Sequence, residues 1–312
     1  MNSISVFAPA SVANVSCGFD ILGFCLEGVG DHFLLEKADH KNIRFKAILG
    51  QELPMDPAKN VAGIAAQALL KEYPVDFGID ITLKKGIKPG SGIGSSSASA
   101  VGIVYALNKM LGLGLKKNEL LPFAMAGESF ASGSAHADNI APALLGGFTL
   151  VRSLEPMDIV QLPSPSNLYA AVIHPQIEIK TSDARAVLSN TVDFKDSIQQ
   201  SANLGALISG LYTEDYELIR RSLVDLLVEP KRAPLIPHFY EMKNAALEMG
   251  ALGASISGAG PSLFALTQGK TNAEKAATAM ANILKSTDIP FEIWVSPINT
   301  KGTITTDDHE IF

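Results

Sequence analysis

The chain has 312 residues, of which 47% are hydrophobic and only 18% are charged, and its formal net charge is −7 at neutral pH. This length and apolar content suit two packed domains and exclude an intrinsically disordered chain. The acidic balance, with no basic stripe along the sequence, argues against a nucleic-acid-binding protein.

The N-terminus has no basic region followed by an apolar stretch, so it does not predict a signal peptide, and no apolar run is long enough to span a bilayer. The two cysteines, Cys17 and Cys25, fit neither a CxxC redox pair nor a zinc site. We therefore expect a cytoplasmic protein with two reduced thiols and no membrane partner.

The first half of the chain mixes short apolar runs with longer helical patterns. Asn60 is the expected N-cap of the first helix, and Gly146 with Gly147 is the expected end of the fourth. Strands are predicted at 4–8, 32–37, 43–48, 77–84 and 148–151, and helices at 60–73, 95–111, 120–130 and 137–145.

The composition changes between 155 and 167, where Pro156, Pro163 and Pro165 stand beside serines. This cluster predicts a domain boundary, and we divide the chain into domains 1–163 and 164–312. The tail at 300–312 is polar and acidic and is expected to be loose. Strands are predicted at 168–173, 262–267 and 291–295, with helices at 197–211, 214–227, 238–249 and 273–285. Because the elements are mixed and not strictly βαβα, the predicted fold class is α+β.

The strongest chemical signal is a glycine-serine segment that follows a predicted strand and opens a predicted helix: Pro89-Gly90-Ser91-Gly92-Ile93-Gly94-Ser95-Ser96-Ser97-Ala98. Alternate glycines allow positive φ and close approach of the backbone to a ligand, and the unpaired N–H groups of the helix attract an anion. Ser95 replaces the last glycine of a Rossmann fingerprint, and no lysine follows as in a Walker A loop. The segment therefore predicts a phosphate loop of another kind. A flexible linker is the alternative, but 98–111 predicts a buried helix.

Two further clusters of small and polar residues stand near predicted strands, the first interrupting one and the second preceding one. The first runs from Ala8 to Gly23, where Asn14 and Asp20 are the polar groups able to hold a small ligand. The second runs from Gly253 to Ser262. Taken singly, the first is also explained by an ordinary surface loop with Asx turns and the second by a tight turn between a helix and a strand.

In this order and spacing, the three clusters together resemble the three motifs of the GHMP kinase superfamily, which includes galactokinase, homoserine kinase, mevalonate kinase and phosphomevalonate kinase. The resemblance covers nearly the whole chain. It implies a two-domain fold whose N-terminal domain is similar to the second domain of ribosomal protein S5 and whose C-terminal domain is a ferredoxin-like α/β plait. It also implies phosphoryl transfer from ATP to a small metabolite.

Four segments resemble the homoserine kinases in particular: Cys17 to Asp20, Ser134 to Gly147, Thr181 to Arg185 and Glu229 to Arg232. The resemblance implies phosphorylation of L-homoserine to O-phospho-L-homoserine in threonine biosynthesis, and it suggests a homodimer. Three alternatives stay open: a superfamily kinase acting on mevalonate, shikimate or a sugar, a nucleotide-binding regulator without catalysis, and a metabolite-binding protein.

The resemblance implies an ATP site in which Asn60 and Val61 lie near the adenine and the loop wraps the phosphates. Ser96 and Glu128 would hold Mg²⁺. Lys88 stands where the family's loop usually has proline, and Pro89 follows it. The cofactor-binding residues expected on this basis are Asn60, Val61, Lys88, Pro89, Gly90, Ser91, Gly92, Ile93, Gly94, Ser95, Ser96, Ser97 and Ala98.

For the acceptor, the resemblance implies Asp20 on the ammonium group, Arg185 and Arg232 on the carboxylate, and Asn139 near the side-chain hydroxyl. Asn14 and His136 would line the same pocket. The expected catalytic residues are Asn139, Ser96 and Glu128. Mevalonate kinase-like members have an aspartate at the position of Asn139, and asparagine cannot take a proton, so we expect catalysis by positioning and electrostatics without a strong base.

Structural roles compete with three of these assignments. Glu128 is also explained as an exposed helix residue and His136 as a hydrogen-bonded structural histidine. Arg232 follows Lys231, and such a pair is usually a solvated surface.

Overall fold

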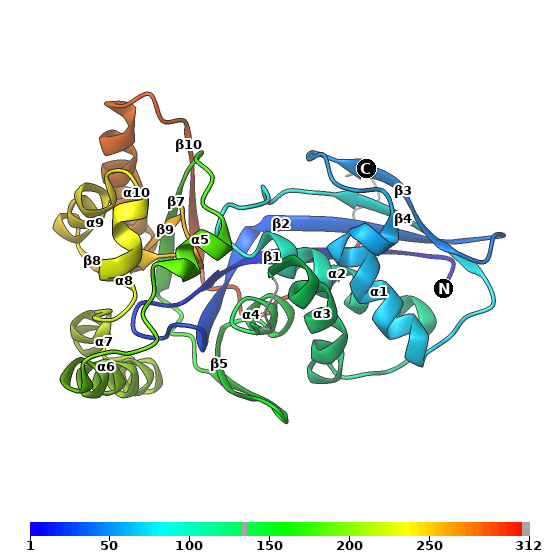
Figure 1. Ribbon diagram of the computed structural model, residues 1–312, viewed down its shortest axis with the longest axis horizontal. Coiled ribbons are helices and arrows are strands. Elements are labelled where there is room, and N and C mark those ends of the chain that lie inside the picture. Colours follow the sequence, from blue (N-terminus) through cyan, green and yellow to red (C-terminus); the bar gives the residue numbers. More distant parts are fainter. Residues whose placement is uncertain (133–135, 308–312) are drawn as a thin grey trace.

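Two β-sheets, each covered by helices, form the two lobes of the chain (Figure 1). The computed structural model describes residues 1–132 and 136–307. The first sheet contains β1 (Ser3–Ala13), β2 (Leu22–Ala38), β3 (Ile43–Leu49), β4 (Gly78–Lys84), β5 (Phe148–Leu154), β6 (Met157–Leu162) and β11 (Ile304–Thr306). Its strands follow the order β11-β1-β2-β4-β3, and the hairpin of β5 and β6 pairs with the beginning of β2. Only β3 and β4 run parallel among these pairs.

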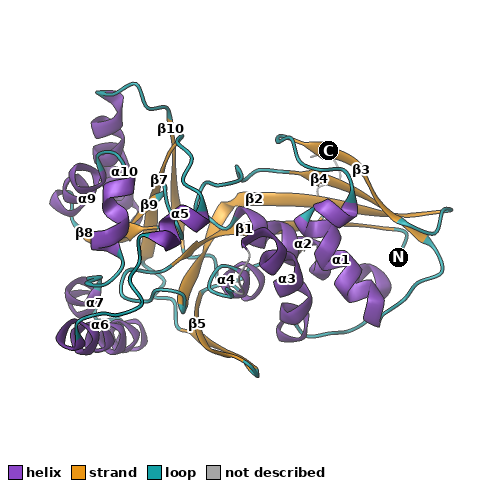
Figure 2. Cartoon of the chain, in the orientation of Figure 1, coloured by secondary structure: helices purple, strands orange, loops and turns teal. Residues whose placement is uncertain are grey.

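The helices of the first lobe pack against one face of its sheet (Figure 2). They are α1 (Val61–Glu72), α2 (Ser95–Leu111), α3 (Lys117–Ser132) and α4 (Ile140–Leu145), with a 3-10 turn η1 (Pro57–Lys59) before α1. Helix α2 is central and almost fully buried against β1 and β2. It lies so close to the sheet that a Cβ on Gly102 would come within 2.4 Å of the Phe33 ring. The small side chains of α2 therefore fix the place where its N-terminus meets the glycine-serine loop.

The second sheet has the antiparallel order β10-β7-β9-β8, made of β7 (Leu168–Pro175), β8 (Ala251–Ile256), β9 (Leu263–Gln268) and β10 (Phe291–Pro297). Helices α9 (Phe239–Glu248) and α10 (Lys270–Lys285) cover one face and form a core with Ala171 and Ile173. The other face packs on the first lobe, where the rings of Phe24 and Phe264 meet edge to face at 5.7 Å. One hydrophobic core thus spans both lobes, and the second lobe has a further core under α9 and α10.

Four helices of different length connect β7 to α9. They are α5 (Thr181–Ala186), α6 (Phe194–Thr213), α7 (Tyr216–Ser222) and α8 (Glu229–Arg232), followed by the 3-10 turn η2 (Ala233–Leu235). Helices α6 and α7 pack against each other, and α7 also contacts β8. Within the described ranges, no helix has the length and apolar character needed to cross a membrane.

The α+β class is confirmed, and the cap of the first predicted helix is correct, because Asn60 Oδ1 accepts a hydrogen bond from the backbone N–H of Ala62 at 3.0 Å. Two strands were not predicted, and one predicted helix is shorter than expected. Residues 157–162 form strand β6, because Glu155 and Pro156 make the turn of a hairpin. The glycine-rich stretch contains strand β8 before its turn, and the helix predicted at 214–227 is only α7.

The predicted loose tail is also partly wrong, because β11 returns to the first sheet and pairs with β1. Residues 308–312 lie outside the described residues. The division at 163/164 falls between the last strand of the β5–β6 hairpin and β7, and it stays our proposed domain boundary. On that division, β11 is a C-terminal segment that completes the N-terminal sheet.

Candidate active site

A cavity of about 390 Å³ lies where the three glycine-containing clusters of the sequence meet. The first cluster contributes Asn14 and Asp20, and the third contributes the turn from Gly258 to Gly260. The second contributes Pro89, Gly90, Gly92, Gly94, Ser95 and Ser96. These segments are far apart along the chain, so only the fold brings them together. Other residues on the wall include Leu53, Lys59, Lys85, Asp138, Ile179 and Thr181.

The loop before α2 has a conformation that requires glycine. Gly90, Gly92 and Gly94 have φ values of 75°, 82° and 71°. A Cβ on Gly92 would lie 2.6 Å from the carbonyl oxygen of Gly260, and one on Gly94 would lie 2.2 Å from Ser11 Oγ. The sequence pattern of alternate glycines therefore reflects both the backbone angles and the close packing of the loop.

Hydrogen bonds join the loop to both other clusters. Ser257 Oγ donates to the Gly92 carbonyl at 2.8 Å, and Ser262 Oγ donates to the Ser91 carbonyl at 2.6 Å. On the other side, the backbone N–H of Ser11 donates to the Ile93 carbonyl at 3.2 Å. Because three of its backbone carbonyls accept these hydrogen bonds, the loop is held against the turn between β8 and β9 and against β1.

The N-terminus of α2 is suited to an anion. Its N-cap is Gly94, which makes no side-chain capping hydrogen bond, and Gly94, Ser95 and Ser96 line the cavity. The first N–H groups of a helix lack intrahelical acceptors, and the helix dipole adds partial positive charge there. This end of the cavity can hold a phosphate group.

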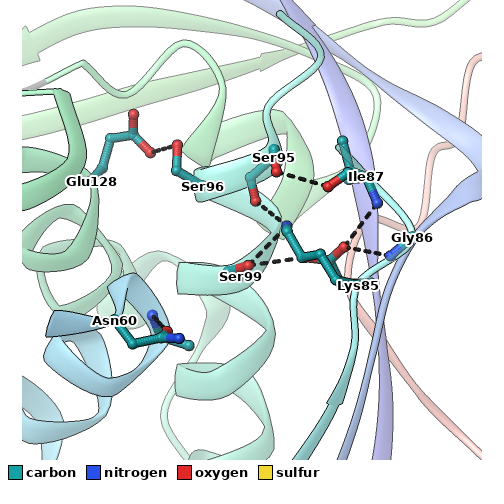
Figure 3. A network of polar contacts seen from close by, with 10 residues as sticks. Asn60, Lys85, Gly86, Ile87, Ser95, Ser96, Ser99 and Glu128 are labelled. Atoms are coloured by element: carbon teal, nitrogen blue, oxygen red, sulfur yellow. Dashed lines mark hydrogen bonds and ion pairs between the residues drawn. The ribbon is translucent and has the colours of Figure 1, made fainter. Parts of the chain in front are cut away.

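Ser96 and Glu128 lie together beside this helix end (Figure 3). Glu128 Oε2 accepts hydrogen bonds from Ser96 Oγ at 2.8 Å and from Ser97 Oγ at 2.9 Å. Glu128 is 8% exposed, so it is not the solvated helix residue that was the alternative; burial raises its pKa, and the two serine hydrogen bonds oppose that shift. A carboxylate and a hydroxyl beside a phosphate site suit Mg²⁺, which usually binds one or two carboxylates, water and substrate phosphates. No cluster of three or more His, Cys, Asp or Glu side chains that could hold a metal occurs among the described residues.

At the other end of the cavity, Asp20 and Arg185 form an ion pair. Arg185 Nη2 donates to Asp20 Oδ1 at 2.8 Å, and Nη1 donates to Oδ2 at 3.2 Å. His136 Nε2 lies 2.9 Å from Arg185 Nη2 and accepts from it, which assigns the ring proton to Nδ1. Burial lowers the pKa of His136, Asp20 opposes the shift, and the two arginines add to it.

Arg232 is buried and not a solvated surface residue. It is 3% exposed, and its Nε and Nη1 donate to the carbonyls of Ala184 and Gly258 at 2.8 and 3.1 Å. Both guanidinium groups lie over the Phe19 ring, with Cζ at 4.9 Å for Arg232 and 5.4 Å for Arg185. Burial lowers the pKa of Arg232 to about 10, which leaves it cationic at neutral pH. Arg185 Nε is buried and has no hydrogen-bond partner among the described residues.

Two asparagines complete this end. Asn14 Nδ2 donates to the Gly258 carbonyl at 2.8 Å, and its Oδ1 accepts from the Asp20 backbone N–H at 2.7 Å, so this side chain braces the loop that carries Asp20. Asn139 Oδ1 accepts from Ser11 Oγ at 2.8 Å, which leaves its Nδ2 amide as the group available to a ligand.

Asp138 is a cavity residue that the sequence reasoning missed. It is 3% exposed, and burial, together with the nearby carboxylates of Asp20 and Glu128, raises its pKa to about 7. The backbone N–H groups of Asp138 and Asn14 oppose that shift. The signal in the sequence was its position between His136 and Asn139; only its burial distinguishes it from a surface carboxylate.

The structure places most of the predicted residues on the cavity wall, but not all of them. Lys88 is exposed and does not line the cavity. Four other predicted residues are buried and do not line it either: Ser91, Ile93, Ser97 and Ala98. Asn60 and Val61 line the far end with Pro54. The Asn60 amide donates to the Pro54 carbonyl at 2.9 Å and caps α1, so it shapes this end of the wall.

Comparison with known proteins agrees with this architecture. The family model of the GHMP kinases N-terminal domain matches residues 60–147, and that of the GHMP kinases C-terminal domain matches residues 207–286. The chain is 44% identical to a homoserine kinase of Chlorobium phaeobacteroides over 97% of this chain and 99% of that one. It is 41% identical to a homoserine kinase of Xylella fastidiosa over 95% and 92%.

Among solved structures, the homoserine kinase of Cytophaga hutchinsonii superposes with a TM-score of 0.95 at 48% identity over 98% of both chains. A mevalonate kinase of L. major superposes with a TM-score of 0.74 at 16% identity, covering 94% of this chain and 95% of that one. The second likeness concerns the fold alone.

Proposed function

Since the chain belongs to the homoserine kinases of the GHMP kinase family, we propose that it transfers the γ-phosphoryl group of ATP to the side-chain hydroxyl of L-homoserine and so forms O-phospho-L-homoserine for threonine biosynthesis. The observation that carries this proposal is that one cavity joins an anion-binding helix end to a pair of arginines and an aspartate. The helix end suits the triphosphate of ATP. The arginines and the aspartate suit an amino acid, because it has a carboxylate and an ammonium group.

At the nucleotide end, the N–H groups of the loop and of the first turn of α2 would hold the phosphates. Ser96 and Glu128 would hold Mg²⁺, which supplies charge neutralisation at the transferred phosphoryl group when it is bound. Asn60 and Val61 would border the adenine. Lys88, which is exposed, is the weakest member of the expected ATP set.

At the acceptor end, the free protein already contains a charge pair like the one that the substrate would bring. The Asp20 carboxylate would bind the ammonium group, and Arg185 would bind the carboxylate through its unpartnered Nε and the rest of its guanidinium group. Binding would therefore exchange one internal ion pair for two pairs to the substrate. Arg232, already bound to two carbonyls, would add its remaining donors.

Between these ends, Asn139 would orient the hydroxyl in line with the γ-phosphate through its Nδ2 amide. The expectation of a site without a base considered only position 139. Asp138, whose pKa is raised to about 7, is partly ionised near neutral pH, and its carboxylate can then accept the proton of the substrate hydroxyl. Positioning and electrostatic stabilisation would still provide most of the rate enhancement.

Family membership also supports three wider parts of the proposal: a small-molecule partner without nucleic acid, a homodimer, and a cytoplasmic location. The proposed domains remain 1–163, with the ATP-binding loop, and 164–312.

The proposal is tested by ADP release from the purified protein with Mg-ATP and L-homoserine, mevalonate, shikimate or galactose. We expect turnover with homoserine alone. Loss of turnover with 4-hydroxybutyrate, which has the same hydroxyl and carboxylate but no amine, would support the role of Asp20. Turnover with another of these acceptors would favour a different kinase of the same fold, and ATP binding without any turnover would favour a regulator.

A further inference from the structure

A buried ion pair lies behind the phosphate loop. Lys85 Nζ is 2.5 Å from Asp31 Oδ2, and the two side chains are 2% and 0% exposed. Asp31 stands in β2, and Lys85 follows β4 directly. An ion pair this deeply buried loses its hydration, and apolar residues of equal volume often stabilise a protein as well. The Asp31–Lys85 pair is therefore expected to have a role other than a contribution to overall stability.

All three donors of the Lys85 ammonium group are used within the protein, and Figure 3 shows two of the residues that accept from it, Ser95 and Ser99. Besides Asp31, Nζ donates to the Ser95 carbonyl at 2.6 Å and to Ser99 Oγ at 3.0 Å. An ammonium group has three donors and no acceptor. Although Lys85 lines the cavity, it has no donor left for a nucleotide, and its contacts are with the first two turns of α2.

The Asp31 carboxylate connects these contacts to the opposite end of the loop. Its Oδ1 accepts from the backbone N–H groups of Gly86 and Ile87 at 3.1 and 3.3 Å, where the chain leaves β4. Its Oδ2 accepts from Lys85 and from Ser99 Oγ at 2.9 Å. Ser95 Oγ donates to the Ile87 carbonyl at 2.9 Å and closes the base of the loop directly. One carboxylate thus fixes the segment that enters the loop and, through Lys85 and Ser99, the helix that leaves it.

We propose that Asp31 and Lys85 are positioning residues that hold both ends of the loop between β4 and α2 in its phosphate-binding geometry before the nucleotide arrives. This inference rests on the proposed kinase function. Donors that are already oriented need no reorganisation when charge develops on the phosphoryl group. Without the Asp31–Lys85 pair, the loop and the first turn of α2 would have to become ordered when the nucleotide binds. This ordering would weaken nucleotide affinity and misalign the γ-phosphoryl group for transfer. The acceptor end, built on other elements, would keep its affinity.

The test compares Asp31→Asn, Lys85→Met and Ser99→Ala with Asp80→Asn as the matched control. Asp80 is a carboxylate in β4 of the same sheet, paired with Arg44 and His40, and it does not line the cavity. For each protein, MgADP binding is measured by calorimetry, kcat and both KM values by ADP release, and stability by urea unfolding.

We expect Asp31→Asn and Lys85→Met to raise the MgADP Kd and the KM for ATP about tenfold and to lower kcat about tenfold, with the KM for homoserine changed less than about twofold. Ser99→Ala, which removes one tether, should shift the same constants about threefold in the same direction. Asp80→Asn should lose stability while its nucleotide constants stay at the wild-type values.

Wild-type MgADP affinity and kcat in folded Asp31→Asn or Lys85→Met would contradict the positioning role and show that the Asp31–Lys85 pair contributes only to stability. If both variants fail to fold, Ser99→Ala decides, and an unchanged MgADP Kd in it overturns the proposal. A wild-type protein that binds MgADP but phosphorylates no acceptor would contradict the proposed function. The MgADP dissociation constants of the variants would still test the positioning role of Asp31 and Lys85.

Discussion

Asp20, Glu128 and Asp138 share the cavity, and each of these carboxylates has a different set of neighbours. Asp20 pairs with a guanidinium group, Glu128 accepts from two serine hydroxyls, and Asp138 is held by backbone N–H groups. Burial raises the pKa of Glu128 and of Asp138. A divalent cation beside Glu128 would stabilise its ionised form, while Asp138 would exchange a proton. We therefore propose an electrostatic role for Glu128 and a proton-transfer role for Asp138.

The metal role of Glu128 is tested by Glu128→Gln, which keeps the shape and removes the charge. We expect kcat to fall about 100-fold or more and the Mg²⁺ concentration needed for half-maximal rate to rise, because one charged ligand is lost. Ser97→Ala is the control, since Ser97 also donates to Glu128 but does not line the cavity. Near wild-type turnover of Glu128→Gln at low Mg²⁺ would contradict the assignment.

The proton-transfer role of Asp138 is tested by the pH dependence of kcat/KM. In the wild type we expect kcat/KM for homoserine to rise with pH through about 7, as the buried carboxyl loses its proton and can act as a base. Asp138→Asn should lower kcat and abolish that rise, while the KM for ATP changes little. A rise with the same midpoint in the variant would assign the titration to another group.

At the scale of elements, the loop before α2 and the turn after β8 form one unit. The Gly92 carbonyl accepts from Ser257, and the backbones of the two segments approach so closely that Gly92 and Gly258 each leave no room for a Cβ. The phosphate loop of one lobe is thus shaped by a turn of the other. This is why a glycine-serine cluster late in the sequence accompanies the one before α2.

This interlocking is tested by Gly92→Ala. The substitution adds a Cβ at φ 82° and at 2.6 Å from the Gly260 carbonyl, so we expect the loop to shift and the MgADP Kd to rise at least about tenfold. Gly112→Ala at the C-cap of α2 is the matched control, because it has φ 66° and open space around the new atom. It should cost about 1 kcal/mol of stability and leave nucleotide binding unchanged. Equal MgADP binding by both variants would argue against the interlock.

At the scale of the whole molecule, the end of the described chain ties the two lobes together. After β10, the Asn299 backbone N–H donates to the Cys25 carbonyl, its carbonyl accepts from Gly147, and its Nδ2 donates to the Leu26 carbonyl. The chain then enters the first sheet as β11, beside β1. Since β1 leads into the loop of Asn14 and Asp20, the closing strand stabilises the element on which the acceptor end is built.

The contribution of β11 is tested by comparing chains that end after Asp307 and after Thr303. The shorter chain lacks β11 and leaves the Ser5 to Phe7 edge of β1 unpaired. We expect it to lose about 1–3 kcal/mol in urea unfolding relative to the chain ending at Asp307, because several ladder hydrogen bonds and their side-chain cover are removed. Equal stability of the two chains would show that β11 adds nothing to the sheet.

Much of the fold could be predicted from local pattern. The strand at 77–84, the helix at 95–111 and the Asn60 cap follow from patterns of neighbouring residues, and each is found where it was predicted. The strands β6, β8 and β11 were missed because proline, glycine and polar residues dominate them or their flanks. They are strands because a partner strand lies beside them, which no local propensity encodes.

The sequence by itself determined that an anion-binding loop precedes a buried helix, because alternate glycines let the backbone approach a ligand and the helix after them presents free N–H groups. It also determined the family, through three clusters in order. Only the tertiary structure decided which side chains face the cavity. Asp138, Asp31 and Lys85 are ordinary charged residues in the sequence, and their importance comes from burial and from partners distant along the chain. Burial strengthens electrostatic interactions and shifts ionisation, and it exists only once the chain has folded.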